Sequence, residues 1–137
     1  MNDIELVKMA LEARDRAYAP YSRFHVGAAL LTNDGKVFTG CNVENVSYGL
    51  TICAERAAVF RAVAEIGPTL KIRKIAVVGE REGAKSPMSG DAAAPCGACR
   101  QVLSEFSDDL EVIVSDIDCN YRKYSLKELL PNAFKKF

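Results

Sequence analysis

The sequence is poor in three features that mark common classes of protein: net charge, histidine and long apolar runs. Lysine plus arginine number 18 and aspartate plus glutamate also 18, so the formal net charge is zero. No basic tail or stripe offers a surface for nucleic acid. No apolar run reaches the roughly 18 residues that a membrane-spanning helix needs. We therefore expect a cytoplasmic protein that binds neither nucleic acid nor membrane.

The scarcity of histidine restricts the kind of metal site that the chain can build. His25 is the only histidine, so a metal site must rely largely on sulfur. The five cysteines are an odd number, and two of them form the tetrad Cys96-Gly97-Ala98-Cys99. This spacing is typical of metal or redox sites rather than of a disulfide framework, and we expect reduced thiols.

Hydrophobic patterning predicts the fold. With 137 residues, 49% of them hydrophobic, the chain fits one compact domain over residues 1–137. Helical periodicity and helix-end signals predict helices at 3–18, 52–66, 95–106 and 126–130. Apolar runs predict strands at 25–32, 36–42, 72–78 and 112–115, the first two joined by a turn at Asn33-Asp34-Gly35. The order of elements predicts an α/β fold, a three-layer α/β/α domain with a mixed sheet.

Two segments at predicted helix starts carry the strongest chemical signal. They are Cys53-Ala54-Glu55 and Pro95-Cys96-Gly97-Ala98-Cys99. Helix N-termini stabilise anions, so thiols there ionise readily and can bind a metal. Three thiolates on one Zn²⁺ leave the fourth tetrahedral position open for water, which distinguishes a catalytic site from a structural one. The pattern predicts one zinc ion per chain, held by Cys53, Cys96 and Cys99.

The two residues after Ala54 have predicted roles beside this zinc. Glu55 lies about 200° round the helix from Cys53, so it need not be a ligand. From there a carboxylate can take a proton from the water, pass it to a ring nitrogen of the substrate and later protonate a leaving amine. Three thiolates and a zinc dication leave one net negative charge, which makes the water less acidic. Arg56 is the candidate that offsets this charge at the sulfurs, with Arg100 as a second candidate.

With these motifs the sequence resembles the zinc-dependent cytidine deaminases of the short, homotetrameric type over nearly the whole chain. The resembling stretches are Pro20–Phe24, Val26–Ala29, Gly40–Asn45, Cys53–Arg56, Pro95–Gln101 and Glu128–Pro131. The resemblance implies a hydrolase that converts cytidine and deoxycytidine to uridine and deoxyuridine and releases ammonia. It places the reaction in pyrimidine nucleoside metabolism, as salvage or as catabolism.

The resemblance also implies the substrate contacts. Asn42 and Glu44 would hold the ribose hydroxyls, and the backbone at Ala54 would contact the base. Phe24 and Phe134 would pack around the pyrimidine. Independently of the family, a carboxylate accepts hydrogen bonds from hydroxyls and repels phosphate, so Glu44 favours a free nucleoside over a nucleotide.

The resemblance implies a homotetramer in which neighbouring subunits complete each pocket. Tyr48 and Phe134 stand at positions that act across the subunit interface. Two features depart from the family pattern: the segment 81–94 is longer than the usual loop, and His25 follows Phe24 where proline is common.

Other interpretations stay open at this point. A structural zinc site with Cys41 or Cys119 as fourth thiolate would make the protein a non-catalytic zinc module. The enzyme could also deaminate another cytosine-bearing small molecule, such as a nucleoside antibiotic. Phe134 and Tyr48 could be interface or core aromatics with no contact to substrate.

Overall fold

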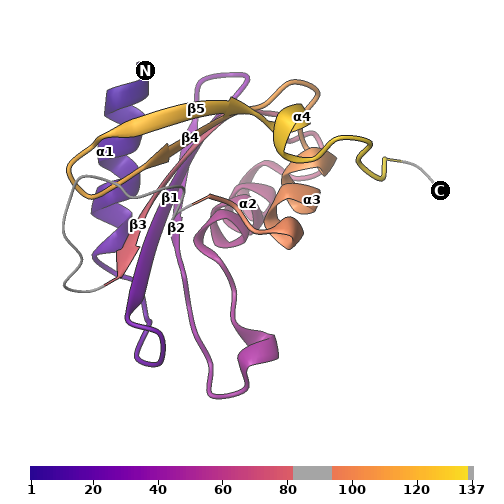
Figure 1. Cartoon of the computed structure of the whole chain (residues 1–137). Helices are drawn as coiled ribbons and strands as arrows, with labels where there is room; N and C mark the ends of the chain where they lie inside the picture. The colour runs from indigo at the N-terminus through magenta and orange to yellow at the C-terminus, as the bar shows by residue number, and fades with distance from the viewer. Residues whose placement is uncertain (82–93, 136–137) are drawn as a thin grey trace.

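The computed structural model describes residues 1–81 and 94–135. A five-stranded sheet lies between helices on both of its faces (Figure 1). Within these residues, no helix combines the length and apolarity needed to cross a bilayer. The elements in chain order are α1 (Asp3–Arg14), β1 (Phe24–Thr32), β2 (Val37–Cys41), the 3₁₀ turn η1 (Tyr48–Leu50), α2 (Ala54–Ile66), β3 (Ile72–Arg81), α3 (Gly97–Glu105), β4 (Glu111–Ser115), β5 (Tyr121–Ser125) and α4 (Leu126–Leu129).

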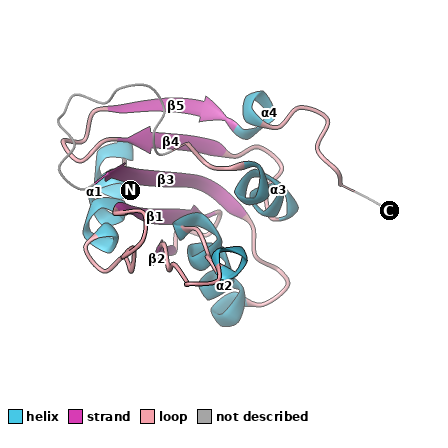
Figure 2. Ribbon diagram, turned by 60° about the horizontal axis from the view of Figure 1, so that its bottom comes forward, coloured by secondary structure: helices cyan, strands magenta, loops and turns pink. Residues whose placement is uncertain are grey.

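The sheet is mixed, with strand order β2-β1-β3-β4-β5. β3 and β4 run parallel, while the other three neighbouring pairs are antiparallel. α1 covers one face, and α2 and α3 cover the other (Figure 2). The predicted three-layer α/β/α fold with a mixed sheet is therefore confirmed.

The central strand β3 shows why the sheet could be read from the sequence. Ala76 and Val78 pack in the apolar cluster under α1, and Ile75 and Val77 pack in the cluster under α2 and α3. A strand that is buried on both faces is apolar at successive positions. This explains the uninterrupted run from residue 75 to 78. The strand continues to Arg81, three residues past its predicted end.

The first helix is shorter than predicted, because it ends at Arg14 instead of continuing to residue 18. Tyr18 pairs through its backbone with the segment after β2. Its N–H donates to the Asn42 carbonyl at 3.0 Å, and its carbonyl accepts from the Glu44 N–H at 2.8 Å. This long-range pairing overrides the helical periodicity of residues 15–18 and fixes the segment that carries Asn42 and Glu44.

The prediction of a polar connection after β4 was wrong, because residues 121–125 form the edge strand β5. The strand pairs antiparallel with β4, with Val112 opposite Tyr124 and Ile113 opposite Lys123. Lys123 forms ion pairs with Asp3 at 3.0 Å and Glu111 at 2.9 Å. Edge strands carry charged side chains that block further pairing, so their sequences look like loops. The predicted loop at 81–94 lies outside the described residues except at its two ends.

Gly40 allows the close approach of α2, the helix that carries Glu55, to the sheet. A Cβ at this position would lie 2.5 Å from the Ala58 N and 2.7 Å from the Ala54 carbonyl oxygen. Gly40→Ala should therefore push α2 outward and destabilise the fold by about 1–3 kcal/mol. Thermal unfolding followed by circular dichroism measures the effect. Gly49→Ala is the control, since a Cβ there meets no atom within 4 Å; equal melting temperatures would contradict this view of the contact.

Candidate active site

The three predicted zinc ligands lie together where two helices begin. Cys53 is the N-cap of α2, Cys96 is the N-cap of α3, and Cys99 lies in the first turn of α3. Their sulfur atoms all lie within 4.8 Å of one another, with 3.9 Å between the Sγ atoms of Cys53 and Cys96. Two sulfurs bound tetrahedrally to one zinc at about 2.3 Å stand about 3.8 Å apart. The donor set and its spacing therefore fit a zinc ion.

The local structure of both helix starts favours thiolates. Neither Cys53 nor Cys96 makes a side-chain capping hydrogen bond, whereas Asn2 caps α1 within a capping box. The N–H groups of each first turn and the positive end of each helix dipole thus act on the thiols. Hydrogen bonds from the Cys99 thiol and the Arg56 guanidinium lower the pKa of Cys53 to about 5. The same contact with Cys53, together with burial, raises the pKa of Cys99.

The remaining cysteines lie elsewhere. Cys41 ends β2, where burial raises the pKa of its thiol, and Cys119 packs against the apolar cluster under α1. Across residues 1–81 and 94–135, the three thiols are the only group of His, Cys, Asp or Glu arranged to hold a metal. The described part of the chain therefore gives no support to a closed site with four thiolates.

Glu55 is a buried carboxyl group beside the thiols. It is only 4% exposed, and it lines the same pocket as Cys53 and Cys96. Burial raises the pKa of Glu55 to about 7, and the charge of Cys53 acts in the same direction. A carboxyl group that titrates near neutrality can both accept and release a proton. Its atoms are not part of the metal-binding group, which agrees with a role other than that of ligand.

The two arginine candidates make different contacts. The Nη2 of Arg56 donates to the Cys53 Sγ at 3.5 Å, and this contact with the sulfur raises the pKa of the guanidinium. Arg100 instead donates from Nε to the Pro95 carbonyl and from Nη1 to the Leu129 carbonyl, both at 2.7 Å. Arg56 is thus the arginine at the sulfurs, while Arg100 ties the segment before Cys96 to α4.

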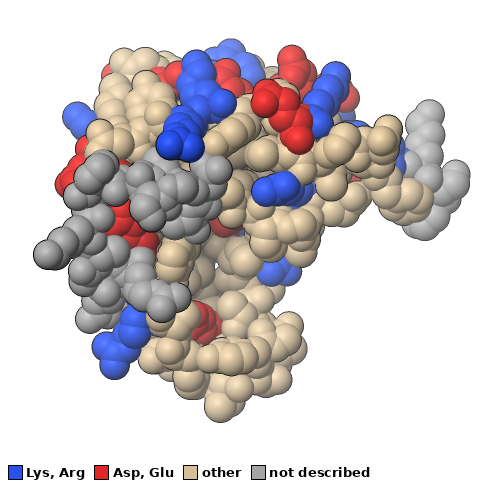
Figure 3. Space-filling model, viewed as in Figure 1, with Lys and Arg blue, Asp and Glu red and all other residues tan. Residues whose placement is uncertain are grey.

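A pocket of about 230 Å³ opens beside the thiols. Its walls come from β1, from the segment after β2, from the start of α2 and from the residues before α3. The lining residues are Ser22, Phe24, Val26, Asn42, Glu44, Thr51, Cys53, Ala54, Glu55, Ala94 and Cys96. A larger hollow of about 490 Å³ lies at the start of β3 and β4 and includes none of the thiols. Charges of both signs mix over the face in Figure 3, without a basic stripe for a polyanion.

The polar side chains Asn42 and Glu44 are buried in this pocket wall, each 8% exposed. The Asn42 Oδ1 accepts from the Val26 N–H at 2.9 Å, and its Nδ2 donates to the Phe24 carbonyl at 2.8 Å. The orientation of the amide is therefore fixed by β1. The Asn42 Oδ1 and Nδ2 each keep one further hydrogen-bonding position, since the oxygen has two lone pairs and the nitrogen two protons.

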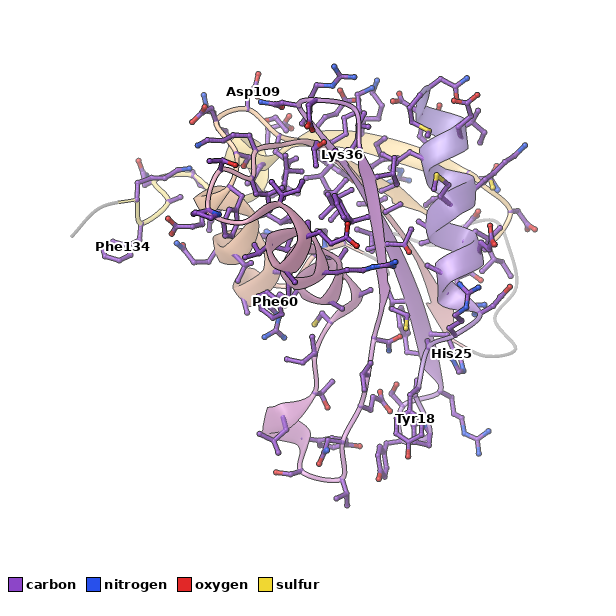
Figure 4. All side chains as sticks on the ribbon, turned by 180° about the vertical axis from the view of Figure 1, so that it is seen from behind. Tyr18, His25, Lys36, Phe60, Asp109 and Phe134 are labelled. Carbon is purple, nitrogen blue, oxygen red and sulfur yellow. The ribbon has the colours of Figure 1, made fainter. Side chains whose placement is uncertain are left out.

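Two predicted substrate contacts do not reach the pocket of their own chain. Tyr48 is 69% exposed and packs edge-on against Tyr21, with ring centroids 6.0 Å apart. Phe134 is 60% exposed and lies on the C-terminal segment outside the body of the chain (Figure 4). Its carbonyl accepts from the Gln101 Nε2 at 2.9 Å, which holds the segment on α3. The other predicted contacts, Phe24, Asn42, Glu44 and Ala54, line the pocket together with Glu55.

Four lining residues had no predicted role: Ser22, Val26, Thr51 and Ala94. Ser22 and Val26 stand in stretches that resemble the family, but neither residue was given a role of its own. A hydroxyl that lies two residues before the pocket aromatic Phe24 was the one signal that could have drawn attention to Ser22.

Known proteins of similar sequence and structure are deaminases. Residues 1–115 match the cytidine and deoxycytidylate deaminase zinc-binding region. The chain is 47% identical over 130 residues to a cytidine deaminase of Halalkalibacterium halodurans, covering 94% of this chain and 91% of that relative. A cytidine deaminase structure from Burkholderia pseudomallei matches with TM-score 0.83 and 51% identity, covering 98% of this chain and 100% of that one.

A more distant relative is a blasticidin-S deaminase of Bacillus cereus, 29% identical over 134 residues, which cover 98% of this chain and 93% of that relative. The matched region spans both cysteine segments and Glu55. The chain therefore belongs to the family of cytidine and deoxycytidylate deaminases that this zinc-binding region defines.

Proposed function

We propose that the protein is a zinc-dependent cytidine deaminase that hydrolyses cytidine and deoxycytidine to uridine and deoxyuridine plus ammonia. The observation that carries the proposal is the position of Glu55, a buried carboxyl group lining one pocket with two of the three clustered thiols. The names of relatives with 47% and 51% identity support cytosine as the base.

Cys53, Cys96 and Cys99 would hold one zinc ion per chain, within a single domain over residues 1–137. When bound, zinc supplies the Lewis acidity that activates water for hydrolysis. Arg56 donates to the Cys53 sulfur and withdraws negative charge from the thiolates. The protein thereby limits the charge that three thiolates place on the metal.

Glu55 moves two protons in the proposed reaction. The oxygen of water forms a bond to C4 of the cytosine, and the bond from C4 to the amino nitrogen breaks. Glu55 carries one proton of the water to N3, where it stays in uridine. It then carries the second proton to the departing amine, which leaves as ammonia. Because burial raises the pKa of Glu55 to about 7, the carboxyl group suits both transfers.

The wall formed by Asn42 and Glu44 would bind the sugar, while Phe24 packs on the pyrimidine and the backbone of Ala54 contacts the base. Burial opposes ionisation of Glu44, but hydrogen bonds from Ser22 and Tyr21 outweigh it, so the pKa of Glu44 lies below its ordinary value. The resulting carboxylate accepts from hydroxyls and repels phosphate. This supports a free nucleoside as substrate rather than a nucleotide.

We further infer a homotetramer in which neighbouring chains complete each pocket. Exposed apolar side chains gather on and around the 43–52 segment, which extends away from the sheet and helices (Figure 1). They are Tyr18, Tyr21, Val43, Val46, Tyr48 and Leu50. A tetramer would cover them and would give Tyr48 and Phe134 pockets on neighbouring chains. Light scattering coupled to size exclusion measures the assembly, with a tetramer expected.

The cytoplasm is the compartment that we propose, with a role in pyrimidine salvage. A reducing environment keeps the three clustered thiols available for zinc. In the described residues these cysteines are free thiols.

A substrate panel tests the proposed function. Zinc-loaded protein should convert cytidine and deoxycytidine, followed by ultraviolet absorbance. The value of kcat/KM should be at least about a hundredfold lower for cytidine monophosphate and for blasticidin S. Preferential turnover of blasticidin S would favour a deaminase for a nucleoside antibiotic. Full zinc content without turnover of any member of the panel would favour a non-catalytic zinc module.

The charge-offset role of Arg56 gives a separate prediction. Arg56→Gln should keep zinc but lower kcat for cytidine by about 10- to 100-fold, because the thiolates lose a charged hydrogen-bond donor. Zinc analysis and steady-state kinetics measure the two effects. Arg61→Gln is the matched control, since the Arg61 Nη1 lies 3.4 Å from the Thr39 hydroxyl on the exposed side of α2. An unchanged rate in Arg56→Gln would remove the charge-offset role.

A further inference from the structure

Residues 20–24 form a turn that donates three hydrogen bonds to the carboxylate of Glu44. The backbone N–H groups of Tyr21 and Ser22 donate to Oε1 at 3.0 and 3.1 Å, and the Ser22 hydroxyl donates to Oε2 at 2.5 Å. A carboxylate offers about four acceptor positions, two on each oxygen. Both positions of Oε1 and one of Oε2 are therefore filled, which leaves a single acceptor position on Oε2.

The backbone of the turn fixes the direction of the Ser22 hydroxyl proton. The Ser22 Oγ accepts from the Phe24 N–H at 2.9 Å, so this side of the oxygen cannot donate. Arg23 between them has φ +60°, in the left-handed region that L residues seldom adopt. With this conformation at Arg23, the backbone turns so that the Phe24 N–H points back to the Ser22 Oγ. The hydroxyl has one proton, and Glu44 is the acceptor that receives it.

The turn also joins the two ends of the pocket. Ser22, Phe24 and Glu44 all line it, together with Glu55 at the thiol cluster. Through one hydroxyl, the backbone of the predicted base contact Phe24 is connected to the carboxylate of the predicted sugar contact Glu44. The Phe24 carbonyl keeps its own hydrogen bond from the Asn42 Nδ2, so a change at Ser22 should act mainly on Glu44, while Glu55 and the thiols keep their own contacts.

We propose that Ser22 is a positioning residue of the sugar subsite, whose hydroxyl holds Glu44 so that one acceptor position is presented to one hydroxyl of the nucleoside sugar. This inference rests on the proposed deamination of nucleosides. Because the presented acceptor is single, a sugar with one ring hydroxyl satisfies it as fully as a sugar with two. The arrangement thus fits an enzyme that accepts both ribose and deoxyribose.

The test compares Ser22→Ala with wild type on ligands with and without ring hydroxyls. The variant should raise KM for cytidine and for deoxycytidine about tenfold, because a charge-assisted hydrogen bond to Glu44 is lost. We expect kcat to change less than about twofold, since the proton-transfer group is untouched. The inhibition constant of 2′,3′-dideoxycytidine, which has no ring hydroxyl to offer, should stay as in wild type.

Three further variants make the result decisive. Ser22→Thr retains the hydroxyl and should restore the wild-type KM. Ser22→Cys places a weakly donating thiol where the hydroxyl was, and it should also raise KM. It is the second test if the alanine variant does not fold. Thr69→Ala removes an exposed hydroxyl outside the pocket and should change nothing. An unchanged KM in the alanine and cysteine variants, or an equal loss of affinity for the dideoxynucleoside, would overturn the role of Ser22. Wild-type protein with full zinc and no turnover of cytidine would instead refute the proposed function.

Discussion

Glu55→Gln should abolish nearly all turnover of cytidine while zinc stays bound. Glutamine has the size of glutamate but cannot exchange a proton near neutral pH, so both proton transfers lose their carrier. General acid–base catalysis contributes about 10²- to 10⁴-fold per group, and we expect kcat to fall by at least about a thousandfold because one residue serves both steps. Steady-state kinetics and zinc quantification on the same preparation measure the two quantities.

The control for this prediction is Glu65→Gln, on an exposed turn of α2, which should retain wild-type kcat. Comparable turnover in Glu55→Gln and wild type would remove Glu55 from the mechanism. Loss of zinc together with activity would mean that the buried carboxyl supports the metal site instead of moving protons.

Cys96→Ala should lose zinc and much of the thermal stability. Cys96 is exposed, so its replacement leaves no cavity in the core, and the loss of stability reports on the metal. Metal binding stabilises only the folded state, and its removal should lower the melting temperature by about 10 °C or more. Elemental analysis and thermal unfolding measure the two effects, and treatment of wild type with a strong chelator should give the same melting temperature.

Cys119→Ala provides the matched control. Its thiol is half-buried in the cluster under α1 and lies outside the metal-binding group, so zinc content should be unchanged. Full zinc occupancy in Cys96→Ala would contradict the three-thiol site, and a fourth ligand would then have to be sought.

Local patterns predicted most of the fold. The apolar runs of β3 and β4 are buried on both faces, and strands of this kind can be predicted because they are apolar at successive positions. The turn at Asn33-Asp34-Gly35 joins β1 and β2 as expected, with Gly35 at φ +90°. The two cysteine segments lie at helix starts because the helical pattern begins directly after each of them.

The elements that were missed depend on partners far along the chain. The polar strand β5 is a strand only because β4 pairs with it, and α1 ends early because Tyr18 pairs with the segment after β2. Periodicity within a short window contains neither contact. Tyr48 and Phe134 lie away from the pocket of their own chain, and their predicted role across a subunit interface stays a prediction.

Arg56 and Arg100 show how much of a side chain's contacts can be predicted from its position on a helix. Arg56 follows Cys53 by three positions, and residues so spaced share a face of the helix, which brings the guanidinium to the sulfur. Arg100 follows Cys96 by four positions, yet two carbonyls, those of Pro95 and Leu129, take its donors. Both arginines adjoin predicted site residues in the sequence, and the structure shows that Arg56 contacts a sulfur while Arg100 binds backbone carbonyls.

Isotope tracing in ¹⁸O-labelled water tests the central claim most directly. Zinc-loaded protein incubated with cytidine should give uridine that carries the heavy oxygen at C4, with one ammonia released per uridine formed. Mass spectrometry and an ammonia assay measure these products. Formation of unlabelled uridine, or no conversion of cytidine by protein that holds one zinc per chain, would contradict the assignment of a hydrolytic cytidine deaminase.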